Sequence, residues 1–301
     1  MSGIPLAEWR AGGKRWRYRE YEIFYRDDPG SGSGSGTVVC IHGFPTASWD
    51  WNLVWNGLRR RFARVLALDM LGFGYSDKPP GHDYSLVDQA TLHEQWLAAL
   101  GVSQAHFLVH DYGVSVAQEL LARHEERRLA KQGGLQLESM CFLNGGLFPE
   151  THRPRPVQKL LASPLGFLVT RLFNEKRFAR SFSEVFGPHT RPGAAELHDF
   201  WTLVERQSGQ RIFHKLIRYM DERRRQRKRW CGVLRQTKVP LRLVNGPEDP
   251  VSGAHMAKRY RELVPNPDVV MLEGIGHYPQ VEHPVGVLDA YLSFRALRNA
   301  S

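Results

Sequence analysis

The sequence predicts an α/β fold, with a mostly parallel central sheet flanked by helices and with an inserted helical cap. Three observations support this prediction. Short apolar runs alternate with amphipathic runs of ten or more residues, which is the pattern of parallel strands joined by crossover helices. The alternation is interrupted once, between residues 144 and 236, and then resumes. Polar residues directly follow several of the apolar runs, at the edge where such sheets bind ligands.

Length and composition fit a large globular domain. The 301 residues can bury a sizeable core, and 42% of them are hydrophobic and 24% charged. No apolar run approaches the roughly 20 residues of a membrane span. The first residues lack the apolar core of a signal peptide, so a cytoplasmic protein is expected. The cysteines are widely spaced and odd in number, which predicts reduced, buried thiols and no metal site at Cys40, Cys141 and Cys231.

The net charge of +10 raises the question of a nucleic-acid partner. Much of the excess lies in two short stretches, residues 10–19 and residues 223–229. Such runs are usually solvated helix faces or tails, and no nucleic-acid-binding motif accompanies them. We therefore expect a small-molecule substrate, no nucleic-acid partner and a solvated face at 223–229. Nothing in the sequence indicates an oligomeric state.

The first strands are predicted from short alternating and β-branched runs. Residues 21–26 alternate like a half-exposed strand, and residues 37–41 form the continuous apolar run of a buried parallel strand. The Gly/Ser run at 30–36 lies between them and follows too few residues to form a domain. It predicts a flexible hairpin connection between these two early strands. Residues 65–68 predict the next buried strand.

The middle of the chain predicts a helix, a strand, a helix and another strand. Residues 86–100 have helical apolar spacing and stop at a glycine. A strand at 105–110 leads to Asp111 and to an amphipathic helix that ends near residue 131. A strand at 139–143 follows.

Residues 144–236 contain six prolines, several helical segments and many large side chains. They predict a helical cap inserted into a core made of residues 1–143 and 237–301. Strands at 240–244 and 269–272, and a helix at 285–297, complete that core.

Three ionisable residues follow predicted strands. Asp111 stands at a sharp turn between a strand and a helix, beside an N–H group and the positive end of the helix. Asp249 and His277 follow the two strands after the cap. Each alone has an ordinary explanation, because Asp often caps helices or forms turns and a single His is usually packed or exposed. Together with the HGFP stretch at 42–45, they favour catalysis by a carboxylate nucleophile.

These motifs make the chain resemble the epoxide hydrolase and haloalkane dehalogenase branch of the α/β-hydrolases. That branch uses an Asp nucleophile, an HGxP stretch and a GH-aromatic stretch near its end, and its fold has the same chain order of nucleophile, acid and histidine. With one member of the branch the resemblance covers nearly everything from residue 20 onward, including the cap. The runs that carry it are HGFPTASWDW (42–51), LGFGYSDKP (71–79), HDYGVSVAQELL (110–121), LNGGLFPETHRP (143–154), VFGPHTRP (185–192), RRRQRKRW (223–230), GPEDPV (246–251) and GHYPQVEHP (276–284).

The resemblance implies a role for each matching residue. Asp111 is expected to be the nucleophile, His277 the general base of the second step, and Asp249 the acid that orients this base. The backbone N–H groups of Phe44 and Tyr112 are expected to form the oxyanion hole. No cofactor is expected.

Two departures from the branch bear on the reaction. Haloalkane dehalogenases commonly hold the halide with a Trp after the nucleophile and an Asn or Trp elsewhere, whereas this chain has Tyr112 and Phe44. Epoxide hydrolases usually protonate the leaving oxygen with two cap tyrosines. Tyr219 is the only tyrosine between residues 144 and 236, and so it is the candidate proton donor. The expected substrate pocket comprises His42, Phe44, Tyr112, Trp201 and Tyr278.

The sequence thus predicts a hydrolase that forms an alkyl-enzyme ester on Asp111, epoxide-hydrolase-like and acting on a small apolar substrate. Haloalkane dehalogenation is the alternative reaction. A catalytically silent protein that keeps the fold to bind a partner is a further alternative. The intact triad argues against this last interpretation, while the incomplete leaving-group machinery keeps it open.

Overall fold

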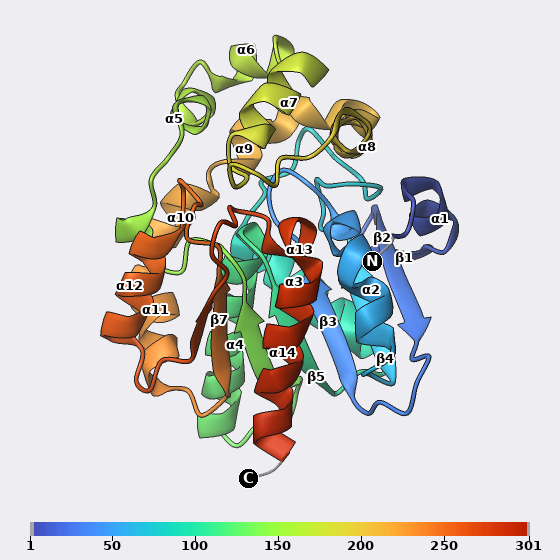
Figure 1. Ribbon diagram of the computed structural model, residues 1–301. Coiled ribbons are helices and arrows are strands. Elements are labelled where there is room, and N and C mark those ends of the chain that lie inside the picture. The colour runs from blue at the N-terminus through green and yellow to red at the C-terminus, as the bar shows by residue number, and fades with distance from the viewer. Residues whose placement is uncertain (1–2, 300–301) are drawn as a thin grey trace.

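An eight-stranded sheet in the order β1-β2-β4-β3-β5-β6-β7-β8 forms the centre of the molecule. The computed structural model describes residues 3–299, and Figure 1 shows the sheet between two layers of helices, with further helices above one end. β2 runs antiparallel to both of its neighbours, and the other pairs are parallel. The strands are β1 (Lys14–Tyr18), β2 (Tyr21–Pro29), β3 (Thr37–Ile41), β4 (Arg64–Leu68), β5 (Gln104–Val109), β6 (Gln136–Phe142), β7 (Leu241–Asn245) and β8 (Val269–Met271).

Helices cover both faces of the sheet. On one face α2 (Asn52–Arg59) packs against α14 (Pro284–Asn299), and on the other α4 (Tyr112–Leu129) packs against α3 (Leu86–Ala99) and α11 (Arg227–Gln236). Parallel strands need such crossover helices, and burial from both sides explains why β3 and β4 are almost continuously apolar. The remaining core helices are α1 (Leu6–Ala11), η1 (Ser48–Trp51), α12 (Ala254–Leu263) and α13 (Pro279–Glu282).

The predicted strands and core helices are present, with ends that differ by at most three residues. Sequence reasoning missed α1, β1 and α2, of which β1 lies within the basic stretch at 10–19 and is largely exposed. The hairpin predicted across residues 30–36 is wrong. β2 pairs with β4 and not with β3, because β4 lies between them in the sheet.

The stretch between β6 and β7 is helical, and none of its described residues forms a strand. Most of it forms a cap above the sheet (Figure 1). α11 lies inside the predicted cap range but packs along α4 beside the sheet, so the division at residues 144 and 236 stays a prediction. The cap elements are η2 (Pro149–Thr151), α5 (Pro156–Ala162), α6 (Gly166–Arg171), α7 (Glu175–Ser183), α8 (Ala194–Glu205), η3 (Arg206–Ile212), α9 (Phe213–Leu216) and α10 (Tyr219–Arg225).

All three cysteines are buried free thiols, as predicted. Within residues 3–299, no helix has both the length and the apolar character needed to cross a bilayer. The same part of the chain contains no group of three or more His, Cys, Asp or Glu side chains arranged to hold a metal ion.

Candidate active site

Asp111 is held at a strained turn between β5 and α4. Its backbone has φ 44° and ψ −105°, a conformation that residues with a side chain rarely adopt. The Asp111 N–H donates to the carbonyl of Asn144 (2.8 Å), and the Asp111 carbonyl accepts from the Val114 N–H (3.1 Å). These bonds hold the turn, and the N-terminus of α4 beside it favours the anionic carboxylate.

Two glycines allow the chain to approach this turn closely. A Cβ atom on Gly43 would lie 2.8 Å from the Asp111 Cβ. A Cβ atom on Gly113 would lie 2.7 Å from the carbonyl oxygens of Ile41 and His42. A side chain at either position would push the loop after β3 away from the carboxylate.

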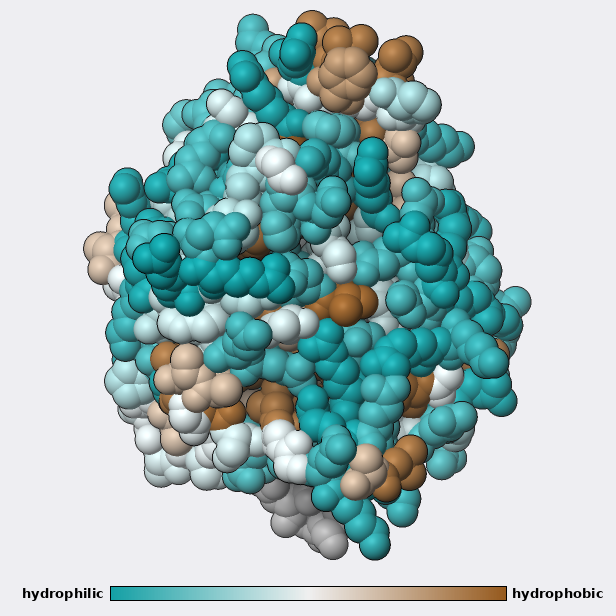
Figure 2. All heavy atoms as spheres, turned by 180° about the vertical axis from the view of Figure 1, so that it is seen from behind, coloured by the Kyte–Doolittle hydropathy of each residue, from teal (hydrophilic) through white to brown (hydrophobic). Residues whose placement is uncertain are grey.

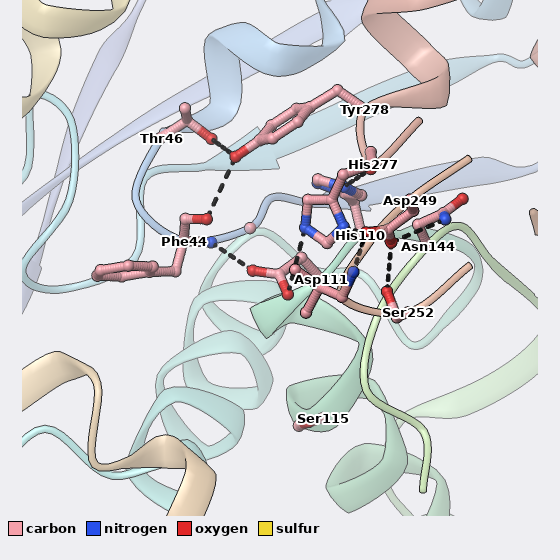
Figure 3. Close-up of polar contacts among 12 residues, drawn as sticks. Phe44, Thr46, His110, Asp111, Ser115, Asn144, Asp249, Ser252, His277 and Tyr278 are labelled. Atoms are coloured by element: carbon pink, nitrogen blue, oxygen red, sulfur yellow. Dashed lines mark hydrogen bonds and ion pairs between the residues drawn. The ribbon is translucent and has the colours of Figure 1, made fainter. Parts of the chain in front are cut away.

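The two oxygens of the Asp111 carboxylate have different surroundings (Figure 3). Oδ2 accepts a hydrogen bond from the Phe44 N–H at 3.0 Å. Oδ1 lies 3.6 Å from His277 Nε2 and 4.0 Å from Arg223 Nη2. The Tyr112 N–H, the second predicted donor, makes no hydrogen bond to this carboxylate in the described structure. Oδ2 therefore accepts from one of the two predicted oxyanion-hole donors, whereas Oδ1 faces His277 and Arg223.

His277 is held by Asp249 on the side away from the nucleophile (Figure 3). Its Nδ1 lies 2.7 Å from Asp249 Oδ2, so its Nε2 faces Asp111. All three side chains are buried, and none of the three residues is more than 5% exposed. The structure thus brings the three predicted residues together in one line.

Asn144 connects the turn of Asp111 to the loop of Asp249. Besides accepting from the Asp111 N–H, it donates from Nδ2 to Asp249 Oδ2 (3.0 Å) and to the Gly246 carbonyl (2.9 Å). Its Oδ1 accepts from the Gly246 N–H (2.6 Å). The Ser252 hydroxyl gives Asp249 Oδ2 another neutral donor at 2.6 Å. Sequence reasoning missed both residues, and the only signal for Asn144 is its place just after a buried strand.

Burial and charge oppose each other at the triad. Burial raises the pKa of Asp111, but the hydrogen bond and charge of His277, helped by Arg223, outweigh burial and hold this pKa below its ordinary value. Burial also raises the pKa of Asp249, yet His277 and the neutral donors lower it to about 2. Burial lowers the pKa of His277, whereas the two carboxylates raise it to about 10. The resting site therefore holds an imidazolium between two carboxylates.

The loop that carries His277 is tied to the cap. The His277 N–H donates to the Val185 carbonyl at 2.8 Å. The carboxylate of Glu282 accepts from two N–H groups of this loop and from the Gly187 N–H of the cap, each at 2.8 Å. The position of the histidine therefore depends on contacts from both parts of the molecule.

An apolar cavity of about 650 Å³, counted with its opening to solvent, reaches Asp111 and His277 from beneath the cap. The Tyr278 hydroxyl donates to the Phe44 carbonyl at 3.2 Å and so steadies the oxyanion loop at its wall. A lining of this kind suits a substrate that is mainly apolar. The lining residues are Phe44, Pro45, Asp111, Arg155, Val157, Gln158, Leu161, Phe173, Phe178, Ser181, Phe182, Val185, Phe213, Val251, His277 and Tyr278.

Two of the five predicted pocket residues, Phe44 and Tyr278, line this cavity. The prediction is wrong for the other three, His42, Tyr112 and Trp201, which do not line the cavity. They pack behind it and support the residues around it. His42 Nε2 accepts from the Met70 N–H at 3.0 Å, which fixes the loop after β3. The buried rings of the other two pack against aromatic neighbours: Tyr112 against Phe73 and Tyr219, and Trp201 against Phe173 and Phe178.

Tyr219 approaches the site from α10. Its ring centroid lies 6.1 Å from that of Phe44, and its hydroxyl lies 3.5 Å from Nε2 of the cavity-lining Gln158. Burial and the negative charge of Asp111 raise the pKa of the phenol, so Tyr219 keeps its proton at neutral pH. The structure places the candidate proton donor beside the cavity wall, although it does not belong to the lining.

Arg223 corrects the prediction of a solvated face for the basic run. It is only 2% exposed. Its Nε donates to the Ser115 hydroxyl (2.6 Å) and its Nη2 to the Asp111 carbonyl (3.1 Å). Its guanidinium carbon lies 4.4 Å from the centroid of the Tyr219 ring. One member of the run is thus a buried cation behind Asp111.

The helical period explains why Arg223 differs from its neighbours. Tyr219, Met220 and Arg223 are three or four residues apart and share the buried face of α10. Arg224 and Arg225 point elsewhere and are exposed, as predicted. The apolar residues at positions 219 and 220 were the signal that sequence reasoning passed over.

His152 is a further histidine near the nucleophile. Neither of its buried ring nitrogens has a hydrogen-bond partner in the described part of the chain. Burial lowers its pKa to about 4, and the charge of Arg223 acts in the same direction. The site therefore contains a neutral imidazole on the cap side that the sequence signalled only by its place in the run at 143–154.

Comparisons with known proteins identify the family and the fold. A family described as the alpha/beta hydrolase family matches residues 38–290. The mesoderm-specific transcript protein of Mus musculus is 43% identical over 295 residues, covering 96% of this chain and 87% of the relative. "Putative hydrolase LipZ" of Mycobacterium tuberculosis is 39% identical over 293 residues, covering 97% of this chain and 99% of the relative.

The sequence runs described above resemble those of one member of the branch from residue 20 onward. That member is the mesoderm-specific transcript protein, and the 43% identity confirms the resemblance. Among solved structures, a loop variant of the haloalkane dehalogenase DbeA from Bradyrhizobium elkanii has a TM-score of 0.78 at 17% identity. The match covers 96% of this chain and 97% of the dehalogenase. At that identity the likeness concerns the fold alone.

Proposed function

Because the chain belongs to the alpha/beta hydrolase family, we propose that it is an epoxide-hydrolase-like enzyme in which Asp111 forms a covalent alkyl ester with a small apolar substrate. The observation that carries the proposal is the uneven environment of the Asp111 carboxylate. One oxygen is held by the Phe44 N–H, and the other faces His277 and the apolar cavity. A carboxylate so placed attacks carbon without first losing a proton.

In the first step, Asp111 Oδ1 attacks a ring carbon of the epoxide. The ring C–O bond breaks, and its electron pair stays on the leaving oxygen. Tyr219 supplies a proton to that oxygen, which gives a hydroxyl group, and the tyrosinate recovers a proton from solvent. The product is an alkyl ester on Asp111.

In the second step, the ester itself prepares the base. Esterification removes the negative charge of Asp111, one of the two carboxylates that raise the pKa of His277. The pKa of His277 then falls, the imidazolium loses a proton to solvent, and the neutral imidazole takes a proton from water. The hydroxide adds to the ester carbonyl, and the charge develops on Oδ2 beside the Phe44 N–H. On collapse the bond between the acyl carbon and the alkyl oxygen breaks, and this oxygen takes the proton of the added hydroxyl group. The diol leaves, Asp111 is again a carboxylate with one solvent oxygen, and His277 is again an imidazolium.

Arg223 has a positioning role in this scheme. Its two hydrogen bonds join the Asp111 carbonyl to Ser115 on the first turns of α4 and so help to hold the strained turn. Its charge, 4.0 Å from Oδ1, helps to keep the carboxylate ionised. Neither contact requires Arg223 to touch the substrate.

The leaving group is the point on which the alternative reaction differs. Haloalkane dehalogenation would begin with the same attack but would release halide and needs side chains that hold it. The Phe44 ring that faces the cavity has no hydrogen-bond donor, and Tyr112 lies behind the lining. Assays of the purified protein with epoxides, haloalkanes and carboxyl esters separate the cases. Diol formation supports the proposal, halide release supports dehalogenation, and no turnover supports a binding protein.

Isotope labelling tests the covalent mechanism directly. A single turnover in heavy-oxygen water should label one oxygen of Asp111. His277→Gln should accumulate a stoichiometric adduct on the peptide that contains Asp111, because the attack needs no base but the hydrolysis does. Asp111→Asn is the matched control and should form no adduct. A labelled serine, or no adduct in His277→Gln with a confirmed substrate, would contradict the mechanism.

A further inference from the structure

The end of the cap carries a group of exposed apolar side chains. Seven large hydrophobic residues are exposed in the described part of the chain, and five of them fall within thirteen positions of α5, α6 and their flanks. Figure 2 shows brown side chains gathered at the top of the molecule, where Figure 1 places α6. We call this group the cap tip: Leu160 (50% exposed), Leu165 (60%), Phe167 (46%), Leu168 (43%) and Leu172 (63%).

The exposure of the cap tip follows from the way its two helices pack. The opposite faces of α5 and α6 are buried, as Leu161 and Thr170 show with exposures of 3% and 1%. Those faces pack against each other and against η3 and α9. The tip residues are therefore the outer side of helices that are already well packed, and an isolated monomer rarely exposes such a group without a use for it.

Cations surround the cap tip. Between residues 153 and 183 the sequence has seven Lys or Arg residues and one acidic residue, Glu175. Glu175 pairs with His198, and Glu184, just beyond the stretch, pairs with Arg155 and Arg180. Within the described residues the other five cations, among them Lys159, Arg171 and Lys176, form no ion pair. Two exposed cations directly adjoin tip residues in the sequence, Lys159 before Leu160 and Arg171 before Leu172.

We propose that the cap tip docks on an anionic membrane surface. Leu and Phe side chains flanked by Lys and Arg form the composition that enters the headgroup boundary, where the apolar groups insert and the cations contact lipid phosphates. A second copy of this chain fits poorly, because two such faces would bring like charges together. An acidic protein partner would satisfy the charges, but intermixed cations and apolar groups fit a continuous lipid interface better.

The cap tip lies next to the route into the active site. Leu161 and Val157 line the apolar cavity from the inner side of α5, while Leu160 projects from its outer side. A shallow surface groove shares Arg155, Val157 and Ser181 with the cavity and continues to Arg177 and Arg180. Docking would therefore bring the entrance of the cavity close to the lipid.

Vesicle sedimentation tests the proposal without any measurement of turnover. The parent protein should bind vesicles of phosphatidylcholine with about one-third phosphatidylglycerol, and bind phosphatidylcholine alone at least about tenfold more weakly. The triple variant Leu165→Ser, Phe167→Ser, Leu172→Ser should lose about tenfold or more in affinity for the anionic vesicles. The variant Lys159→Gln, Arg171→Gln, Lys176→Gln should lose a similar factor, and the loss should shrink at high salt.

Matched controls distinguish binding by the cap tip from non-specific hydrophobic adsorption and from non-specific electrostatic attraction. Leu129→Ser removes an apolar side chain that is 73% exposed but lies at the far end of α4. Arg224→Gln, Arg225→Gln, Lys228→Gln removes three exposed cations from the other basic run. Both controls should bind vesicles like the parent. Equal losses in tip and control variants would overturn the proposal.

A fluorescent label gives a second readout that does not depend on affinity. The native cysteines are buried, so an environment-sensitive dye can be attached selectively to Leu165→Cys, and to Leu129→Cys as the control. Anionic vesicles should shift the emission of the dye at position 165 to the blue and leave the dye at position 129 unchanged. Two results would overturn the proposal: no vesicle binding by the parent, or a parent dimer in solution that only the tip variants dissociate.

Discussion

The core and cap walls of the active site are built differently. On the core wall, Asp111, Asp249 and His277 follow strands and are fixed by one another and by groups such as the Phe44 N–H. On the cap side, Tyr219 and Arg223 come from α10, a helix of seven residues, and lie behind the lining of the cavity. The core therefore supplies the three candidate catalytic residues. The cap supplies the candidate proton donor and a charge that tunes the nucleophile.

This difference predicts how substitutions on the two walls should act. Changes on the core wall should stop a chemical step whatever the substrate, because they remove a group that the step requires. Changes on the cap wall should depend on the leaving group and on pH, because they alter protonation and charge around a geometry that stays in place.

The largest effect should come from Asp249→Asn. Without the carboxylate, His277 loses the partner that orients its Nε2 and stabilises the imidazolium. We expect hydrolysis of the ester to slow by roughly 10⁴-fold, with formation of the ester much less affected. Rapid-quench measurements of both steps test this. Equal slowing of the two steps would show that Asp249 instead supports the nucleophile.

A pH series should separate the two steps in the parent protein. Asp111 has a lowered pKa and stays ionised, so ester formation should be flat between pH 5 and 9. Ester hydrolysis needs neutral His277 and should fall about tenfold per pH unit below the pKa that this residue has in the ester. That pKa should lie below about 10, because the Asp111 charge that helps to raise it is then absent. Single-turnover rates give both profiles, and a flat profile for hydrolysis would exclude His277 as the base.

Tyr219→Phe tests whether the cap protonates the leaving oxygen. Opening of an epoxide should slow by about 10²-fold, since general acid catalysis typically contributes at least that much. Hydrolysis of an activated ester should change little, because its leaving group needs no proton. Because both substrates are assayed with the same variant, a loss of folded protein would lower both rates by the same factor and leave their ratio unchanged. A similar loss on both would remove Tyr219 from the mechanism.

The smallest effect is expected for Arg223→Gln. Loss of the cation should raise the pKa of Asp111, but His277 still lowers this pKa, so ester formation should slow by at most about twofold near pH 4 and stay unchanged at pH 8. Arg223→Lys keeps the charge and should restore the pH profile more than the thermal stability. Arg225→Gln, an exposed change in the same helix, is the matched control. An unchanged pH profile in Arg223→Gln would leave the residue only a structural role.

The sequence predicted the core side of the site better than the cap side. The proximity of Asp111, Asp249 and His277 could be predicted because strand ends in a parallel sheet converge at one edge. The hairpin at 30–36 was wrong because the order of strands in a sheet need not follow their order in the chain: β4, the strand after β3, lies between β2 and β3. Arg223 was misjudged because a run of charges hides which residue faces inward.

The contacts of Asn144 limit where the cap can be exchanged between related proteins. It is the first residue of the predicted cap, yet it accepts from the Asp111 N–H and donates to Asp249. Gly145 beside it is equally bound to the core, since a Cβ atom there would lie 3.0 Å from the Asp111 Cα. A chimera joined at residue 144 would import foreign supports for the nucleophile along with the new cap. The seam for modular engineering therefore lies beyond Gly145, and a graft made there keeps the contacts of Asn144 with Asp111 and Asp249. The new cap must still supply the contacts that Val185 makes with His277 and Arg223 with Asp111.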